Sequence, residues 1–257
     1  MRLLVLALSM ALWPAAQGPA VDVTALKFGP PVLVAEIDAS KLKGEIRRLA
    51  WKPDGTALYV QAAEGKPPGE TARHYALDVA GGALTALESE PDWAAGYWAV
   101  KQDRAAPGIP SLVIEIQQGI EAFKPGPGAS GVLDRQSSPD AVAGGSPNAE
   151  NLANGMHGNQ SVLVVRLKFA GQDIAVWANE RPFPGMKFSW GPPGSGALVF
   201  AGERGALVFL DGERRRLAVP GVKDAFLPAW SAEGGRVAYV QKVGRKKLAI
   251  SWLAVEK

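Results

Sequence analysis

The strongest constraint on the fold is a tryptophan-led unit that recurs along the chain. Each copy has a tryptophan, a short turn that contains glycine, and an alternating apolar strand. The copies open at Trp51, Trp93, Trp190 and Trp230. In the first copy, WKPDGTALYVQ, Pro53 presets φ and Gly55 accepts a positive φ without a steric penalty. We expect the same role for Gly96, Gly194 and Gly234. Such self-similarity predicts a series of similar structural units.

A second pattern lies downstream of each copy and is typical of a β-hairpin: a strand, a short polar turn and another strand. It occupies residues 74–87, 111–123, 162–177 and 206–219. A tryptophan unit followed by such a hairpin supplies about four strands. The sequence therefore predicts four-stranded antiparallel units.

The spacing of the units predicts their architecture. Successive tryptophans are 42, 97 and 40 residues apart, and about 40 residues with four strands per unit is the spacing of a β-propeller. The long interval holds two hairpins, so we expect two blades within it. The chain is thus predicted to be an all-β propeller of about five four-stranded blades, with four and six left open. An N-terminal strand from residues 32–45 would complete the last blade, close the ring and remove its free edges.

The repeat resembles that of a known family. LAWKPDGTALYVQ (residues 49–61) and LPAWSAEGGRVAYVQ (residues 227–241) are similar to the WD40-like repeat of TolB-type β-propellers. In that repeat a proline and an aromatic residue precede Ser-Pro-Asp-Gly and an apolar strand. The resemblance runs over residues 46–257 and is weakest at 121–160. TolB has an extra N-terminal domain, for which residues 21–46 leave no room, so the resemblance implies the repeat fold and not a Tol–Pal role.

The N-terminus is typical of a secretory signal peptide over residues 1–20. Arg2 precedes an apolar run over residues 3–13, and small residues follow up to Ala20. The run is shorter than the roughly 20 residues that span a bilayer, and no later run is long enough. Cleavage after Ala20 would begin the mature chain near Val21. We expect a single exported domain over residues 21–257, in a periplasm or outside the cell, without a transmembrane segment after signal removal.

One stretch interrupts the repeat. Residues 124–160 are rich in Gly, Ser, Pro and Asn and have almost no apolar periodicity, so they bury too little surface to offset the entropy of ordering. We expect a loop that limited proteolysis cuts first, within an insertion at 121–160. Loops of this length are functional or disordered. If the insertion binds a ligand, the first candidates are Asn148, Glu150, Asn154 and His157.

Composition and motifs exclude several kinds of site. The chain has no cysteine and only two histidines, His74 and His157, which excludes disulfides, thiol catalysis and most metal sites. No nucleophile elbow, phosphate-binding loop or dinucleotide motif occurs, so we expect no metal and no cofactor. The chain has 28 Lys and Arg against 25 Asp and Glu. This excess is too small for a nucleic-acid-binding surface.

The charged and aromatic residues have local explanations. Turn carboxylates usually bond to nearby backbone amides, and we expect this of Asp54, Asp78, Asp92, Asp211 and Glu233. The basic runs 214–216 and 242–247 fall in turns at opposite ends of their blades, which favours solvated charge over one merged patch. The four repeat tryptophans are expected in the core between blades.

These observations favour a binding role. The leading hypothesis is an exported, non-enzymatic, monomeric β-propeller that acts as a scaffold for an unknown protein or small-molecule partner, with its ligand surface on loops. The alternative is a propeller hydrolase or lactonase-type enzyme that uses carboxylates at the mouth of the central channel. A third hypothesis is a permanent subunit, which would expose an apolar patch on one face.

Overall fold

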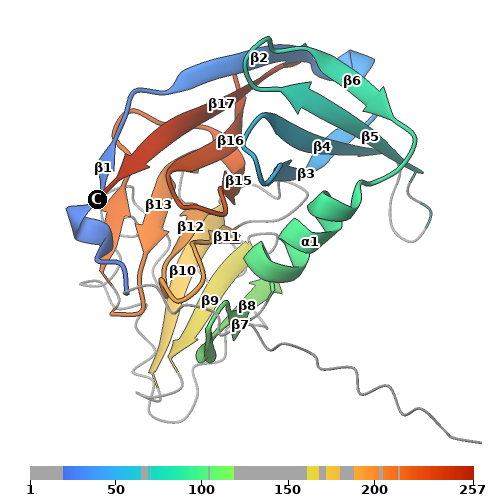
Figure 1. Cartoon of the computed structure of the whole chain (residues 1–257). Helices are drawn as coiled ribbons and strands as arrows, with labels where there is room; N and C mark the ends of the chain where they lie inside the picture. The colour runs from blue at the N-terminus through green and yellow to red at the C-terminus, as the bar shows by residue number, and fades with distance from the viewer. Residues whose placement is uncertain are drawn as a thin grey trace, which may run out of the picture.

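The structure, a computed structural model, describes residues 20–64, 69, 71–103, 105–118, 161–167, 172–179, 188–202, 205–213 and 215–257. Within these ranges the chain is mostly β, with four antiparallel sheets and one α-helix (Figure 1). The predicted signal peptide, apart from Ala20, and the insertion at 121–160 lie outside the described residues.

The first sheet is an up-and-down arrangement of four strands. These are β3 (Glu45–Trp51), β4 (Ala57–Glu64), β5 (Thr71–Asp78) and β6 (Leu84–Leu87). The β3–β4 connection is the predicted turn, in which Gly55 has a φ of 70° and its amide donates to the Lys52 carbonyl at 2.8 Å. The Asp54 carboxylate accepts from the Thr56 amide at 2.9 Å. Both the tryptophan unit and the hairpin at 74–87 are present as predicted.

The other sheets repeat this order. The second sheet contains β7 (Ala105–Ala106), β8 (Ile109–Gln118), β9 (Ser161–Leu167) and β10 (Gln172–Asn179). The third sheet contains β11 (Phe188–Trp190), β12 (Leu198–Ala201), β13 (Leu207–Leu210) and β14 (Arg216–Ala218). The last sheet contains β15 (Ala225–Trp230), β16 (Arg236–Lys242) and β17 (Lys247–Glu256). The hairpins predicted at 162–177 and 206–219 are therefore present, whereas the described part of 111–123 is one strand, β8.

Two N-terminal strands pair with β17. β2 (Val32–Asp38) is antiparallel to the first part of β17, with Asp38 opposite Lys247, and β1 (Lys27–Phe28) pairs with the other end, with Phe28 opposite Val255. The 3-10 helices η1 (Val23–Ala25) and η2 (Ala39–Lys41) flank these strands. An N-terminal strand thus completes the last sheet, while the closed ring and the number of blades stay predictions.

The predicted strand after Trp93 is wrong, because these residues form helix α1 (Asp92–Lys101). The buried residues of α1 are Ala94, Tyr97 and Lys101, which are three and four positions apart, as residues on one side of a helix are. Alanine favours helix, and Asp92 in the first turn interacts favourably with the helix dipole. Gly96 therefore lies inside a helix and not in a turn. Figure 1 shows α1 between the first and second sheets.

Three apolar clusters join neighbouring sheets. One lies between the last and first sheets and includes Ile250 and Leu58. Another lies between the last and third sheets and includes Tyr239 and Phe209. The last lies between the third and second sheets and includes Phe200 and Leu112. The helix α1 packs against β3 of the first sheet and β11 of the third. The sheets therefore stabilise one another mainly by apolar packing.

Three of the four repeat tryptophans end the first strand of a sheet and are buried there. They are Trp51 in β3, Trp190 in β11 and Trp230 in β15. The indole Nε1 of Trp51 donates to the Ala229 carbonyl at 2.9 Å, which links the first sheet to the last. Trp93 lies instead in α1, is half-buried, and meets the Tyr59 ring edge-on at 6.1 Å between centroids.

Candidate functional site: a pocket at the N-terminal segment

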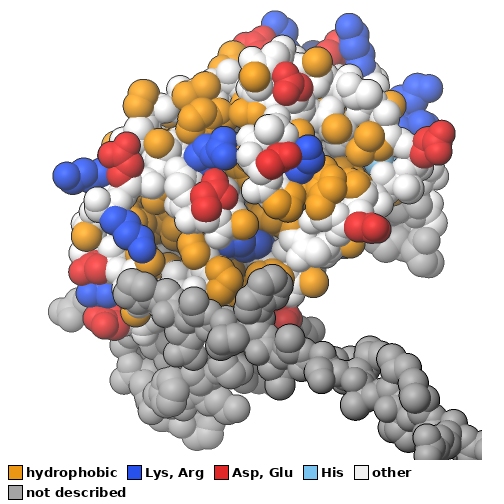
Figure 2. Space-filling model, viewed as in Figure 1, with side chains coloured by type: hydrophobic (Ala, Val, Ile, Leu, Met, Phe, Trp, Pro, Cys, Tyr) orange, Lys and Arg blue, Asp and Glu red, His pale blue; other side chains and the backbone are white. Residues whose placement is uncertain are grey.

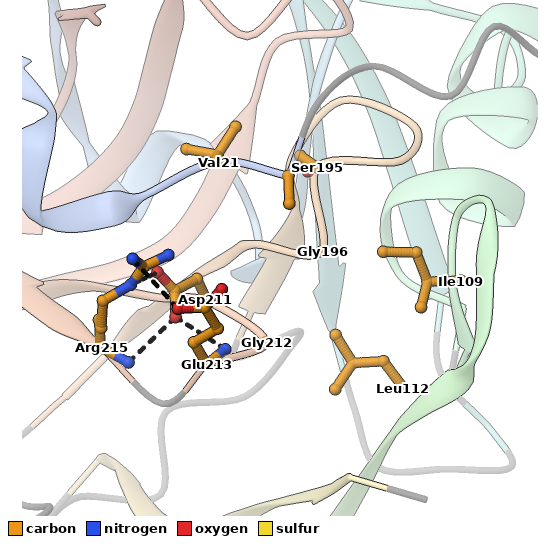
Figure 3. A pocket seen from close by; sticks show the side chains of 10 residues that line it. Val21, Ile109, Leu112, Ser195, Gly196, Asp211, Gly212, Glu213 and Arg215 are labelled. Carbon is orange, nitrogen blue, oxygen red and sulfur yellow. Dashed lines mark hydrogen bonds and ion pairs between the residues drawn. The ribbon is translucent and has the colours of Figure 1, made fainter. Parts of the chain in front are cut away.

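A pocket of about 200 Å³ lies where the N-terminal segment meets the second and third sheets (Figure 3). Ile109 and Leu112 at the start of β8 form one wall. Asp211 and Arg215, in the turn between β13 and β14, form the opposite wall, and Val21 and Ser195 lie beside it. The pocket therefore has an apolar side and a charged side.

Asp211 organises the charged side. It is 3% exposed. Its Oδ1 accepts from the backbone amides of Glu213 and Arg215, each at 3.0 Å. Its Oδ2 accepts from the Val23 amide at 3.2 Å and from Arg215 Nε at 2.7 Å. A carboxylate has about four lone-pair positions, so these four donors use the whole accepting capacity of Asp211. This side chain fixes the turn and holds the N-terminal segment against it.

Arg215 is shared among three carboxylates. Besides Asp211, its Nη1 lies 2.9 Å from Asp22 Oδ2 and 3.2 Å from Glu213 Oε2. The hydrogen bond to Asp211 raises the pKa of Arg215 further, and the pKa of Asp22 is lowered, first by the Thr24 hydroxyl and also by the charge of Arg215. Three carboxylates against one guanidinium leave a local charge of −2. This side of the pocket therefore favours a cationic or hydrogen-bond-donating group over an anion.

The geometry gives Asp211 no role as a general base. A base must reach the proton it removes with a free lone pair, and the four donors already occupy those of Asp211. Within the described ranges, no group of three or more His, Asp and Glu side chains is placed to hold a metal ion. The polar wall of the pocket is thus made of groups that already bond to one another.

The other candidate carboxylates make their contacts within their own turns. Asp54 bonds to Thr56 and pairs with Lys52 at 2.8 Å. Asp78 accepts from the Gly81 amide, and Glu233 lies 3.4 Å from Arg236. These three carboxylates have the local roles expected of turn carboxylates. Asp92 does not, because it lies in the first turn of α1 and not in the predicted turn.

His74 lies on β5 and is half-buried. Its Nδ1 is 2.7 Å from the Tyr59 hydroxyl, which also accepts from Gln61 Nε2 at 3.4 Å. Burial of Tyr59 raises its pKa to about 12. The pairing of Gln61 with His74 across β4 and β5 explains why these side chains meet, and sequence spacing alone does not reveal it.

Lys101, which the sequence analysis did not identify, is a buried lysine at the C-terminal end of α1. Lys101 is 2% exposed, and its Nζ donates to the carbonyls of Gly191 at 2.8 Å and Ser231 at 3.2 Å. Burial lowers the pKa of Lys101 to about 7, against an opposing effect of Glu233. Because these carbonyls directly follow β11 and β15, Lys101 fixes α1 to two sheets.

The basic runs lie where the sequence predicts. Arg215 lies in the turn between β13 and β14, and Arg216 begins β14. Residues 242–247 run from the end of β16 through the turn to the start of β17. Arg215 is engaged in the pocket, whereas Lys242 and Arg245 are exposed. Figure 2 shows basic and acidic side chains scattered over this face, with hydrophobic side chains gathered between α1 and the first sheet.

The predicted ligand-binding residues Asn148, Glu150, Asn154 and His157 lie outside the described residues. The structure therefore does not place them. The pocket is lined instead by residues that no sequence pattern marks as functional, among them Val21, Ser195 and Leu112. In the part of the chain that the structure describes, no helix is long and apolar enough to cross a bilayer.

No protein-family profile matches the sequence, and no curated protein matches it significantly. Among solved structures, the chain is similar to the Dos1 propeller, with a TM-score of 0.30, 9% identity, and coverage of 80% of this chain and 41% of that one. It is also similar to Sqt1 from Chaetomium thermophilum bound to the N-terminus of the ribosomal protein L10 (TM-score 0.23, 11% identity, 85% and 47% coverage). A further similarity is to TolB from Acinetobacter baumannii (TM-score 0.23, 10% identity, 84% and 44% coverage).

The chain spans less than half the length of these three proteins. At such TM-scores the likenesses carry no argument about activity or partner. The propeller-like description of this chain rests on its own four sheets.

Proposed function

We propose that this chain is an exported, monomeric β-propeller of the TolB-like repeat type that binds a partner protein or small molecule and does not catalyse a reaction. Four antiparallel sheets, each built mainly from strands that follow one another along the chain, support the propeller assignment. In this proposal each of the four described sheets is one blade. A fifth, which the repeat spacing predicts, would have to come from residues outside the described ranges.

In this proposal β2 completes the last blade by pairing with β17, and α1 packs beside β3 of the first blade and β11 of the third. Tyr97 and Lys101 tie α1 to the third and last blades, because they bond to groups at the ends of β11 and β15. Closure of the ring by β2 leaves fewer unpaired strand edges.

The observation that carries the binding role is the pocket between Leu112 and Arg215. Its polar side consists of groups that already bond to one another, so it can attract a ligand but offers no free carboxylate on Asp211 for proton transfer. Its volume of about 200 Å³ is smaller than the roughly 300–1,000 Å³ of sites for larger ligands. We therefore propose that it accepts one small branched or aliphatic cationic group, such as a single side chain or an alkylammonium.

An NMR titration tests this role with two branched probes of similar size and opposite charge, isobutylammonium and isobutyrate. The amides of Ser195 and Gly212 report on the pocket. We expect isobutylammonium to shift these signals in a saturable manner and isobutyrate to bind at least tenfold more weakly. Saturable binding of isobutyrate alone, or of neither probe, would contradict the proposal.

Two glycines provide matched variants. A Cβ on Gly212 would meet Leu112 Cδ2 at 3.9 Å and Gly196 O at 3.7 Å, which are ordinary contact distances inside the pocket. Gly235, in another turn, has open space around it. Gly212→Leu should therefore fill the pocket and abolish saturable binding, whereas Gly235→Leu should leave binding unchanged.

A further inference from the structure

The chain passes from solvent into the fold between Ala20 and Val21. Ala20 is exposed. Val21 is buried, and its backbone nitrogen donates to the Ser195 carbonyl at 3.0 Å. Val23 is fully buried, and its amide donates to Asp211 Oδ2 at 3.2 Å. The bond at which the sequence predicts cleavage therefore lies at the edge of a segment that the third sheet holds.

Cleavage at this bond changes the charge of the Val21 nitrogen. Hydrolysis by a signal peptidase consumes one water, whose oxygen becomes part of the new carboxylate of Ala20. Both hydrogens of that water end on the nitrogen of Val21, which is then an ammonium at neutral pH. A neutral amide with one N–H thus becomes a cation with three. The Ser195 carbonyl can accept from either form.

The surroundings of Val21 are negatively charged. Val21 lines the same pocket of about 200 Å³ as Asp211, Glu213 and Arg215, and Figure 3 shows it on the side of that charged group. The next residue, Asp22, pairs with Arg215 at 2.9 Å. Three carboxylates against one guanidinium attract a further cation, and salt screens this attraction only in part over the dimensions of so small a pocket.

The structure also orders the events. A peptidase must reach the bond before Val21 is buried. The residues that hold the segment are made late, since Val23 and Asp211 are 188 positions apart. The segment therefore cannot dock until the third sheet has been synthesised, so cleavage can precede docking.

We propose that the α-ammonium of Val21, created by cleavage after Ala20, binds at the acidic side of the pocket and fixes the N-terminal segment there. One of its N–H groups donates to the Ser195 carbonyl, and its charge interacts with the nearby carboxylates. The local charge becomes −1, so the pocket still favours a cationic group. Maturation thus stabilises one wall of the pocket. This inference rests on the proposed export and deepens the proposed binding role.

Urea unfolding of two chains that differ only at the N-terminus tests the proposal. One chain begins at Val21, and the other begins at Gly18 and keeps a neutral amide at Val21. At pH 6.5 we expect the shorter chain to have a urea midpoint higher by about 0.4 M, which corresponds to roughly a tenfold change in the folding equilibrium. Titration of Lys101 is common to both chains and cancels in the difference.

The pH dependence of this difference identifies its cause. The folded chain favours the charged form of the α-amino group, so the advantage is present below the ordinary titration range of about 7.7–8.0 and is lost as the pH rises above it. At pH 10 the two midpoints should agree.

Substitution of an exposed carboxylate provides a second measurement. Glu213 lines the pocket and its side chain is 72% exposed, so Glu213→Gln removes a charge and keeps the shape. It should reduce the difference between the two chains by at least a third. Glu88 is also exposed and is not part of the pocket. Glu88→Gln is therefore the matched control and should leave the difference unchanged.

Three results would overturn the proposal. They are equal midpoints at pH 6.5, an advantage that persists at pH 10, and equal effects of Glu213→Gln and Glu88→Gln. Titration of both chains with isobutylammonium separates this inference from the proposed function. Binding of the probe by both chains with equal midpoints would reject the role of the ammonium alone. Unequal midpoints without probe binding would reject the ligand-binding role alone.

Discussion

The hydroxyl of Tyr97 lies 3.0 Å from the carbonyl oxygen of Trp230, and this hydrogen bond joins α1 to the end of β15. One helical turn later, Lys101 donates to the next carbonyl, that of Ser231. Tyr97 and Lys101 of α1 thus bond to the backbone carbonyls of two successive residues, Trp230 and Ser231, at the end of β15.

We predict that Lys101 makes stability depend on pH. Its pKa is about 7 in the folded chain, against an ordinary value of 10.5. Between these values the unfolded chain binds one more proton, so stability should rise with pH from about 7 to about 10. The urea midpoint measured across this range checks the prediction.

The variant Lys101→Met isolates this contribution, because it keeps a long side chain and removes the titrating group. Its stability should lack the rise that the unchanged protein shows. Lys41→Met, at an exposed lysine of η2, should retain the rise. Identical pH profiles for the Lys101 variant and the unchanged protein would show that the burial of Lys101 is not maintained in solution.

Trp230→Ala should lower the free energy of unfolding by roughly 3–5 kcal/mol, as loss of a buried large aromatic does. Trp230 is 1% exposed, meets Phe209 edge-on at 4.8 Å between centroids, and donates to the Gly234 carbonyl at 2.9 Å. Trp93→Ala should cost less because Trp93 is half-buried. Chemical denaturation of both variants checks the order, and an unchanged midpoint for Trp230→Ala would contradict a core role.

Asp211→Ala should cost about 2–4 kcal/mol, because it removes a buried acceptor from four donors, one of them charged. Glu213→Ala provides the matched control. Glu213 contacts the same guanidinium but its side chain is 72% exposed, so its loss should change stability by about 0.5 kcal/mol or less. Equal costs for the two substitutions, measured by urea unfolding, would refute the structural role of Asp211.

Export should produce a mature chain that begins at Val21. Val21 is buried, and its backbone nitrogen donates to the Ser195 carbonyl at 3.0 Å. An α-ammonium at that nitrogen can make the same hydrogen bond, so cleavage after Ala20 keeps the contact. Expression in a bacterial host, followed by mass spectrometry of the periplasmic fraction, checks this, and an intact N-terminus in the cytoplasm would argue against export.

The strands were predictable where a turn and an alternating pattern act together. The Pro-Asp-Gly turn before β4 and the hairpin of β13 and β14 are examples, since both are determined by neighbouring residues. The helix α1 was missed because Trp93 and Gly96 match the repeat by residue type. The helical spacing of Ala94, Tyr97 and Lys101 indicates a helix. A hydrophobicity pattern does not show this spacing, because lysine counts as a polar residue although Lys101 is buried.

The pocket was not predictable, because it depends on contacts between distant segments. Val23 and Asp211 are 188 positions apart, and Leu33 meets Ser251 only through the pairing of β2 with β17. Asp211 itself was identified as a turn carboxylate. Its bond to the N-terminal segment requires the tertiary structure.

The pairing of Phe28 with Val255 and of β2 with β17 has a consequence for biosynthesis. A ribosome makes residues 27–38 first and residues 247–256 more than 200 residues later, so the early strands wait for almost the whole chain before they find their partners. Contacts of such long sequence separation form slowly. A chain that crosses a membrane in an unfolded state would gain from this delay, because its final sheet cannot assemble until the last strand has emerged.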